Sequence, residues 1–146
     1  MPEKKTLEKA RKAKRQGKAP TTQAGPFVEE EIEHIREGKH GARSTKQAIA
    51  IGLSKARRAG VKLPPPPKSA SERTKRSAKS AARRKGKRPS PSRSRAAKTA
   101  LKGESRSAAS SKALSRHAKQ VARRRPKRAR KAAAKRAAKT RARTTR

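Results

Sequence analysis

The chain has 146 residues, of which 47 are Lys or Arg and nine are Glu, with no Asp, and its formal net charge is +38 at pH 7. Hydrophobic residues make up 29% of it, which excludes one large apolar core. The absence of Cys excludes disulfides and thiolate metal sites. We see no apolar run of signal-peptide or membrane-spanning length, so we expect no membrane partner and a location in the cytoplasm or nucleoid.

A positive charge of this size favours a polyanionic partner, which here means nucleic acid. Proteins that read single strands or RNA sequence usually stack bases on aromatic side chains. This chain has one Phe and neither Tyr nor Trp. Phe27 is better explained as a core residue than as a stacking platform, so the composition favours duplex DNA over single strands.

Residues 1–24 form a basic N-terminal arm, which we expect to be solvated and helical for part of the time. Within residues 2–18, Leu7 is the one large apolar residue. The arm ends in a polar linker, residues 19–24, before the first strongly patterned segment of the chain.

Residues 25–63 are predicted to form a helical hairpin module. Pro26 suits a first helical position, and the three acids at positions 29–31 would then lie in the first turn, where negative charge is favourable. An apolar stripe follows, and Gly38 can end the helix in a left-handed conformation. We expect the first helix over about 26–37.

The second helix is expected over about 44–59. Ser44 and Gln47 match a capping box, and Gly60 with Val61 matches a Schellman ending. A short turn joins the two helices, which predicts an antiparallel pair. Ile51 lies off the apolar stripe. It is either a singly exposed residue or a candidate interface, for a homodimer or for another segment of the chain.

Beyond the hairpin, residues 64–68 are predicted to be a polyproline spacer and 69–146 a Lys/Arg/Ala/Ser-rich tail. We therefore expect a mostly disordered, low-complexity chain around a small all-α hairpin. Pieces near 70–85, 107–125 and 127–143 would become helical on binding. The run from Ser90 to Arg93 resembles a minor-groove turn of histone tails, with a solvated linker as the alternative.

The turn between the two helices is the best defined candidate site, because Lys39, Arg43 and Lys46 converge on a helix start that also favours an anion. An ordinary capped connector is the alternative. His34 and His40 lack the carboxylate or Cys companions of a metal site, so we expect no metal. Ser44 has no base beside it and no acid–base pair is present, so we expect no catalytic residue, and we expect no cofactor. The full set of predicted nucleic-acid-binding residues is Lys39, Arg43, Lys46, Arg57, Arg58, Arg83, Arg84, Arg93, Arg123, Arg124, Arg125, Lys127 and Arg128.

The runs GKHG at 38–41 and STKQAIAIGLSKAR at 44–57, followed by 60–66, resemble a family of small basic bacterial proteins. Its members are uncharacterised or labelled DNA-binding or plasmid-stabilisation proteins. The resemblance implies a bacterial origin and supplies no mechanism. The tail is similar to linker-histone tails in composition.

The sequence thus predicts a non-enzymatic, histone-like and nucleoid-associated DNA binder that neutralises phosphates without reading sequence. Two alternatives stay open. One is an RNA- or ribosome-associated basic protein. The other is a protein-binding adaptor, retained on DNA by its tail, with a role in plasmid maintenance.

Overall fold

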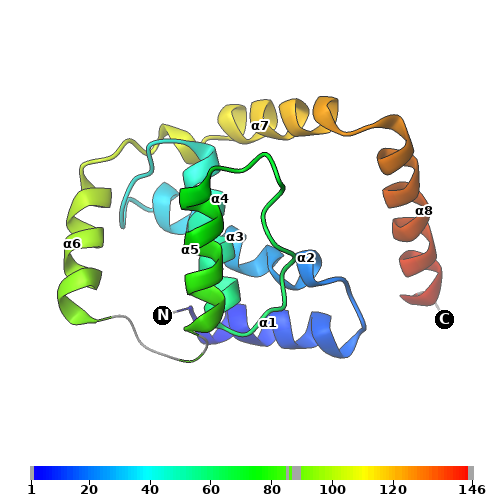
Figure 1. The fold of residues 1–146 in the computed structure, drawn as a ribbon, viewed down its shortest axis with the longest axis horizontal. Coiled ribbons are helices and arrows are strands. Elements are labelled where there is room, and N and C mark those ends of the chain that lie inside the picture. The colour runs from blue at the N-terminus through cyan, green and yellow to red at the C-terminus, as the bar shows by residue number, and fades with distance from the viewer. Residues whose placement is uncertain (1, 85, 87–89, 145–146) are drawn as a thin grey trace. The chain divides into compact units, whose positions relative to one another are not determined.

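The computed structural model describes residues 2–84, 86 and 90–144, and every regular element in these ranges is a helix (Figure 1). The chain divides into two compact units, residues 1–110 and 111–146. None of the described helices combines the length and apolar character needed to cross a membrane. The elements are α1 (Lys4–Arg15), α2 (Pro20–Gln23), α3 (Gly25–Arg36), α4 (Thr45–Arg58), α5 (Glu72–Arg83), α6 (Pro91–Lys102), the 3₁₀ turn η1 (Ser107–Ala109), α7 (Ser111–Arg124) and α8 (Lys127–Thr144).

The prediction of a mostly disordered, low-complexity chain is wrong, although its all-α class agrees with the structure. Four helices, α5 to α8, occupy most of the chain after the polyproline segment. The physical reason is local. Ala, Arg and Lys are among the best helix formers, and the prediction gave net charge more weight than this propensity. Ser71 caps α5 by accepting a hydrogen bond from the Thr74 backbone N–H at 3.3 Å.

The run from Ser90 to Arg93 is neither a minor-groove turn nor a linker in the structure. Ser90 has an extended backbone at the N-cap, and Pro91 occupies the first turn of α6. Proline suits this position because its missing N–H would have no helical partner there. The same residues that indicated a loop therefore begin a helix.

Helices α3 and α4 begin and end within one residue of the predicted bounds. Ser44 caps α4, since its Oγ accepts from the Gln47 backbone N–H at 3.2 Å. The Gln47 side chain also reaches back, but its Oε1 accepts from the Arg43 N–H at 2.8 Å and not from Ser44. This variant of the capping box satisfies two backbone donors at the helix start.

The predicted Schellman ending of α4 is confirmed. Gly60 has a φ of 92°, in the left-handed region that favours glycine. The Val61 N–H donates to the Ala56 carbonyl and the Gly60 N–H to the Arg57 carbonyl, both at 3.0 Å. Gly38, with a φ of 78°, ends α3 by the same pattern of bonds.

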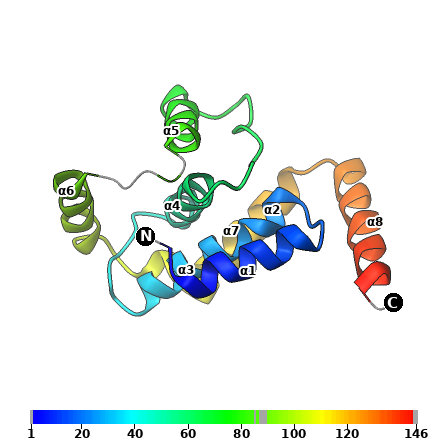
Figure 2. The same cartoon turned by 90° about the horizontal axis from the view of Figure 1, so that it is seen from below.

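The predicted antiparallel pairing of α3 and α4 is wrong, because the two helices cross (Figures 1 and 2). The crossing point is Gly52, where a Cβ would lie 2.7 Å from the Val28 Cα and 2.9 Å from the Phe27 carbonyl oxygen. Glycine therefore lets the backbones approach more closely than any other residue would allow.

The apolar core joins α1, α3 and α4, so the N-terminal segment is packed and not a solvated arm. Phe27 is fully buried at its centre, which confirms its expected core role. The buried members of this cluster are Ala10, Ala24, Phe27 and Ala56, with Leu7, Leu53, Val61 and Leu63 packed against them. Nine of the twelve buried hydrophobic residues among those described are alanine, which gives a weak apolar signal in the sequence.

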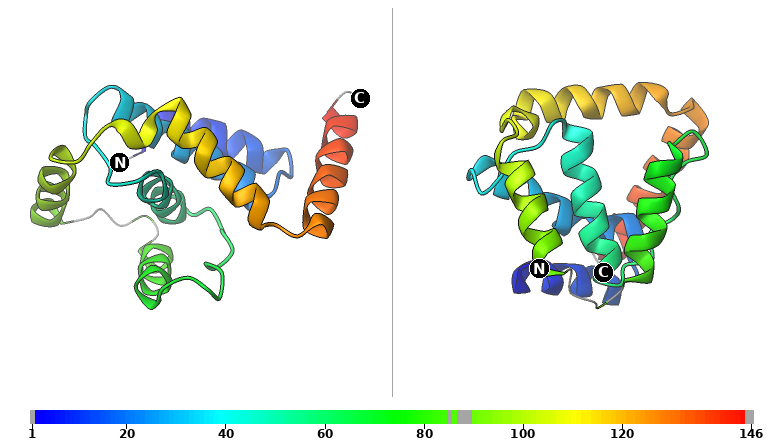
Figure 3. Two further views of the ribbon diagram at one scale, coloured as in Figure 1. Left: turned by 90° about the horizontal axis from the view of Figure 1, so that it is seen from above. Right: turned by 60° about the vertical axis from the view of Figure 1, so that its left-hand side comes forward.

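Segments after the polyproline run pack onto the crossed helices. Helix α5 lies alongside α4 (Figure 3). The turn η1 lies against α3 and α4, where the Thr45 hydroxyl donates to the Ala108 carbonyl at 2.7 Å and Arg36 Nε to the Ala109 carbonyl at 2.9 Å. The Gly41 N–H also donates to the Leu101 carbonyl at 2.8 Å. Residues 1–110 therefore form one folded unit.

Gly52→Ala should destabilise this unit. Helix propensity alone would favour Ala by about 1 kcal/mol, but overpacking at the crossing should cost about 1–3 kcal/mol and decide the sign. Chemical denaturation followed by circular dichroism measures the change. Gly103→Ala is the control, because the Gly103 backbone has a helical φ and a Cβ there would meet its nearest atom at an ordinary 3.8 Å. A Gly52→Ala protein as stable as the wild type would contradict the close crossing.

Glu30 is a buried acid whose stability contribution should depend on pH. Burial would raise its pKa, but hydrogen bonds from Thr6 and the Glu3 backbone N–H, together with Lys55, outweigh burial and hold the pKa below 4.5. A pKa lower in the folded than in the unfolded chain stabilises the fold above about pH 4.5, and this stabilisation is lost as the pH falls through the folded value.

Glu30→Gln should therefore cost about 1–3 kcal/mol near neutral pH and flatten the acid limb of the stability curve, because the charge-assisted hydrogen bonds are lost. Glu33→Gln, at an exposed position on the same helix, is the matched control. Unfolding curves between pH 3 and 7 would make the comparison. An acid limb of unchanged slope in Glu30→Gln would show that this carboxylate has no such role.

Candidate nucleic-acid interface

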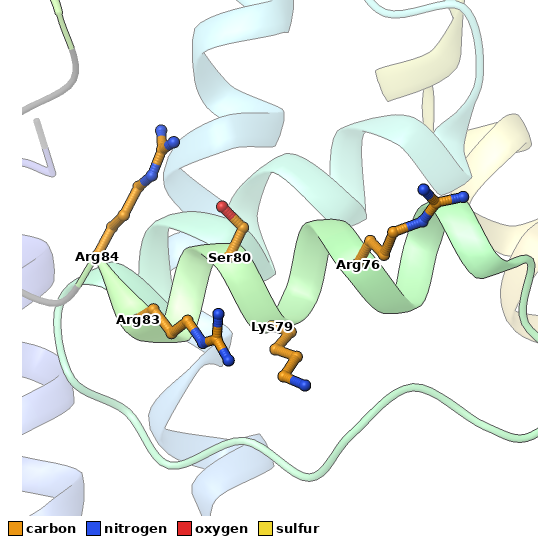
Figure 4. Close-up of a pocket in the computed structure, with 5 residues that line it drawn as sticks. All are labelled: Arg76, Lys79, Ser80, Arg83 and Arg84. Carbon is orange, nitrogen blue, oxygen red and sulfur yellow. The ribbon is translucent and has the colours of Figure 1, made fainter.

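Helix α5 presents basic side chains along one face, and the opposite face packs toward α4. Five residues line a shallow groove there and project from successive turns, with Lys79 and Arg83 on one flank and Ser80 and Arg84 on the other (Figure 4). Ala81 on the opposite face is buried. The groove residues, the α5 stripe, are Arg76, Lys79, Ser80, Arg83 and Arg84.

Helix α7, in the second unit, carries the same arrangement. Its groove residues, the α7 stripe, are Arg116, Lys119, Gln120, Arg123 and Arg124. Both sets fall at i, i+3, i+4, i+7 and i+8, which places them on one side of a helix. The sequences RSAKSAARR at 76–84 and RHAKQVARR at 116–124 share the pattern R-x-A-K-x-x-A-R-R.

Each stripe combines three guanidinium groups and one ammonium group with a single neutral polar side chain. Among the residues that the structure describes, none of these eight cations lies within ion-pair distance of an acid. Arg offers a planar fork of donors that matches a phosphate, and Lys offers a point charge. The two stripes are therefore exposed cationic rows suited to a polyphosphate backbone.

The turn between α3 and α4 is less free for an anion than predicted. Lys39 Nζ lies 2.8 Å from Glu37 Oε2, and Arg43 Nε lies 3.5 Å from Glu104 Oε1. The hydrogen bond to Glu37 raises the pKa of Lys39, and the Glu37 pKa is lowered in return. Lys46 is exposed. An adjacent acid, Glu37, and a distant one, Glu104, thus compensate part of the charge that was expected to meet a phosphate.

Arg57 and Arg58 take part in local structure. An Arg57 guanidinium N–H donates to the Pro64 carbonyl at 3.2 Å, and burial lowers the pKa of Arg57. Arg58 donates to the Ser54 hydroxyl at 3.4 Å, and its carbonyl accepts from the Gly86 N–H at 3.0 Å. These interactions tie the end of α4 to the segments on both sides of α5.

The other predicted residues are distributed over several elements. Arg93 is exposed on α6, and Arg125, Lys127 and Arg128 are exposed where α7 ends and α8 begins. Ile51, the candidate interface residue, is partly exposed on α4, the helix on which α5 packs.

Four predicted residues are brought into the stripes, two in each: Arg83, Arg84, Arg123 and Arg124. Sequence reasoning missed the cations on the preceding turns, Arg76, Lys79, Arg116 and Lys119. The repeated nine-residue pattern, separated by 40 positions, is the signal that could have found them.

Comparison with known proteins gives a partial match. Residues 4–68 are similar to a family of unknown function, DUF6496. No curated protein and no solved structure matches the chain. The matched region contains α1 to α4 and ends before α5, so both stripes lie beyond it.

Proposed function

We propose that the protein is a non-enzymatic binder of nucleic acid, with duplex DNA as its preferred partner, and that the α5 and α7 stripes contact the phosphate backbone. The observation that carries the proposal is the repetition of one cationic pattern on two helices. A stripe spans eight residue steps, or about 12 Å at about 1.5 Å per residue, and one strand of duplex DNA carries a charge per about 3.4 Å of axis, so each stripe is long enough to meet several phosphates.

The lack of an exposed Phe, Tyr or Trp supports a duplex over a single strand. Phe27, the single residue of these three types, is fully buried and cannot stack on a base. Binding would then rest on phosphate contacts, which position a protein on DNA without carrying sequence information. We expect little sequence preference as a result.

The resemblance to small basic bacterial proteins agrees with this function but does not define it. A bacterial origin, a nucleoid location, a histone-like role and a part in plasmid maintenance are proposals of the same kind. Self-association through α4 at Ile51 belongs with them. The alternative is an RNA- or ribosome-associated role. Competition of a labelled DNA duplex with RNA would distinguish this role from DNA binding.

Replacing the four cations of each stripe with Ala should weaken binding to duplex DNA by a similar factor on all sequences. It should also make the plot of log K against log salt shallower, by about 0.9 for each phosphate that the protein no longer neutralises, or roughly 3–4 per stripe. Ala keeps the helix propensity, so the fold should persist. Gel shifts or fluorescence anisotropy at several salt concentrations give both quantities.

A control of equal charge removes four exposed cations of α1, Lys4, Lys5, Arg11 and Lys12. The stripe variants should lose more affinity and more slope than this control. Equal losses in both would mean that net charge alone sets the affinity and that the stripes are no interface. If duplex RNA displaced a labelled DNA duplex more strongly than unlabelled duplex DNA did, RNA would be the preferred partner.

A further inference from the structure

Away from the stripes, Glu31, His34 and His40 converge at the end of α3. One potential ligand atom from each lies within 4.8 Å of the others. Glu31 and His34 are three residues apart and share a face of the helix. The left-handed Gly38 then turns the chain so that His40 returns to the same place. Glu31 is the companion that the sequence did not show beside these two histidines.

The hydrogen bonds of His40 define what its ring presents to this cluster. Its Nδ1 lies 3.0 Å from the Gly41 carbonyl oxygen, and because a carbonyl only accepts, Nδ1 carries the hydrogen. Its Nε2 lies 3.1 Å from Glu31 Oε1. Without a second hydrogen on the ring, two lone pairs would face each other there. The arrangement therefore calls for a proton or a cation between these atoms.

His34 has the second feature of a ligating histidine. Its Nε2 lies 3.1 Å from Glu3 Oε1, so an ionised Glu3 accepts from this nitrogen and leaves the lone pair on Nδ1. Metal-binding histidines commonly donate their other N–H to a carboxylate or a backbone carbonyl, which fixes the tautomer. Glu3 serves His34 in this way, and the Gly41 carbonyl serves His40.

Glu31 is held so that one oxygen is left for a ligand. Its side chain is 1% exposed, and its Oε2 lies 2.6 Å from Lys55 Nζ. This approach lacks the geometry of a hydrogen bond, so charge holds the pair together. Oε1 faces His40. Glu3 and Glu37 lie nearby and pair with Lys39, so they offset the charge of that ammonium group beside the cluster.

We propose that Glu31, His34 and His40 form a binding site for one divalent transition metal ion, with Zn²⁺ the best fit. Two imidazoles and one carboxylate match the borderline-soft character of Zn²⁺, whereas Mg²⁺ and Ca²⁺ favour all-oxygen sites. Ligand atoms about 3.4 Å apart surround a tetrahedral Zn²⁺, so the cluster needs a small contraction. Three protein ligands leave a fourth position for water.

The bound ion would clamp the turn after α3. His40 precedes Gly41 and Ala42, whose N–H groups donate to the Leu101 and Ser105 carbonyls at 2.8 and 3.0 Å. Holding this turn would therefore also hold the segment around 101–105. The site lies apart from the α5 stripe in sequence and chemistry, so the inference is independent of the proposed function.

The test uses the full-length protein after dialysis against a chelator. Titration with Co²⁺ should give one equivalent of saturable binding with the visible absorption of a tetrahedral nitrogen/oxygen site. Zn²⁺ should displace it and raise the melting temperature, because an ion that binds the folded state stabilises it. His34→Ala and His40→Ala should each lower Zn²⁺ affinity at least roughly tenfold, and Glu3→Gln about 10–100-fold as a partner of a ligand.

His117→Ala is the matched control, because His117 is the third histidine and lies on α7, outside the cluster. It should bind one Zn²⁺ as the wild type does. Equal loss in His117→Ala, or unchanged affinity in the His34→Ala/His40→Ala double variant, would overturn the site. A wild-type protein that shows no saturable Co²⁺ or Zn²⁺ binding would also overturn the site, and this measurement does not depend on whether a variant folds. In that case a proton, and not a metal ion, would lie between His40 Nε2 and Glu31 Oε1.

Discussion

The ion pairs of Lys55 with Glu30 and Glu31 hold the first unit together. Burying a carboxylate is unfavourable unless a partner and hydrogen bonds compensate it. Here α3 supplies two buried acids and α4 supplies the ammonium group, 3.3 Å from Glu30 Oε1 and 2.6 Å from Glu31 Oε2. Helix α1 joins them, because the Glu3 N–H donates to Glu30 at 3.1 Å. One small polar cluster thus links three helices, of which α1 and α4 bury only alanine among their hydrophobic side chains.

This arrangement also separates the charges of the chain. Seven of the nine acids lie in the first 67 residues, and two of them are buried. The sixteen Lys and Arg of residues 111–146 have no acid among them. Because Glu30 and Glu31 are buried inside the first unit and pair with a specific cation there, the surface is more basic than the composition alone implies. The same partition leaves both stripes uncompensated.

The local features of the fold could be predicted from sequence, and the long-range ones could not. Caps and left-handed glycines act within a few residues, so Ser44, Gly38 and Gly60 indicated the ends of α3 and α4. The crossing at Gly52 depends on a backbone far along the chain, and a glycine within a helical pattern does not identify its neighbour. The prediction of a disordered tail was wrong because Lys and Arg contribute both to a high net charge, which favours disorder, and to a high helix propensity, to which Ala adds.

The candidate site shows the same division. The sequence indicated Arg83, Arg84, Arg123 and Arg124 as members of basic runs, but the stripes depend on helical spacing, which a count of charge does not measure. Lys39 and Arg43 look equally basic in the sequence. Arg43 is compensated by Glu104, an acid that becomes its neighbour only after the later segment has folded back.

That folding back has a consequence for the order of events during synthesis. Thr45 and Ala108 are 63 positions apart, and Arg36 and Ala109 are 73 apart. At a translation rate of about 5–20 residues per second, the later partner follows the earlier one by several seconds or more. In that interval α1 to α4 exist without η1, with the Thr45 hydroxyl and the Arg36 guanidinium open to other acceptors. The nascent chain therefore passes through a stage in which these two donors lack the partners that they have in the folded protein.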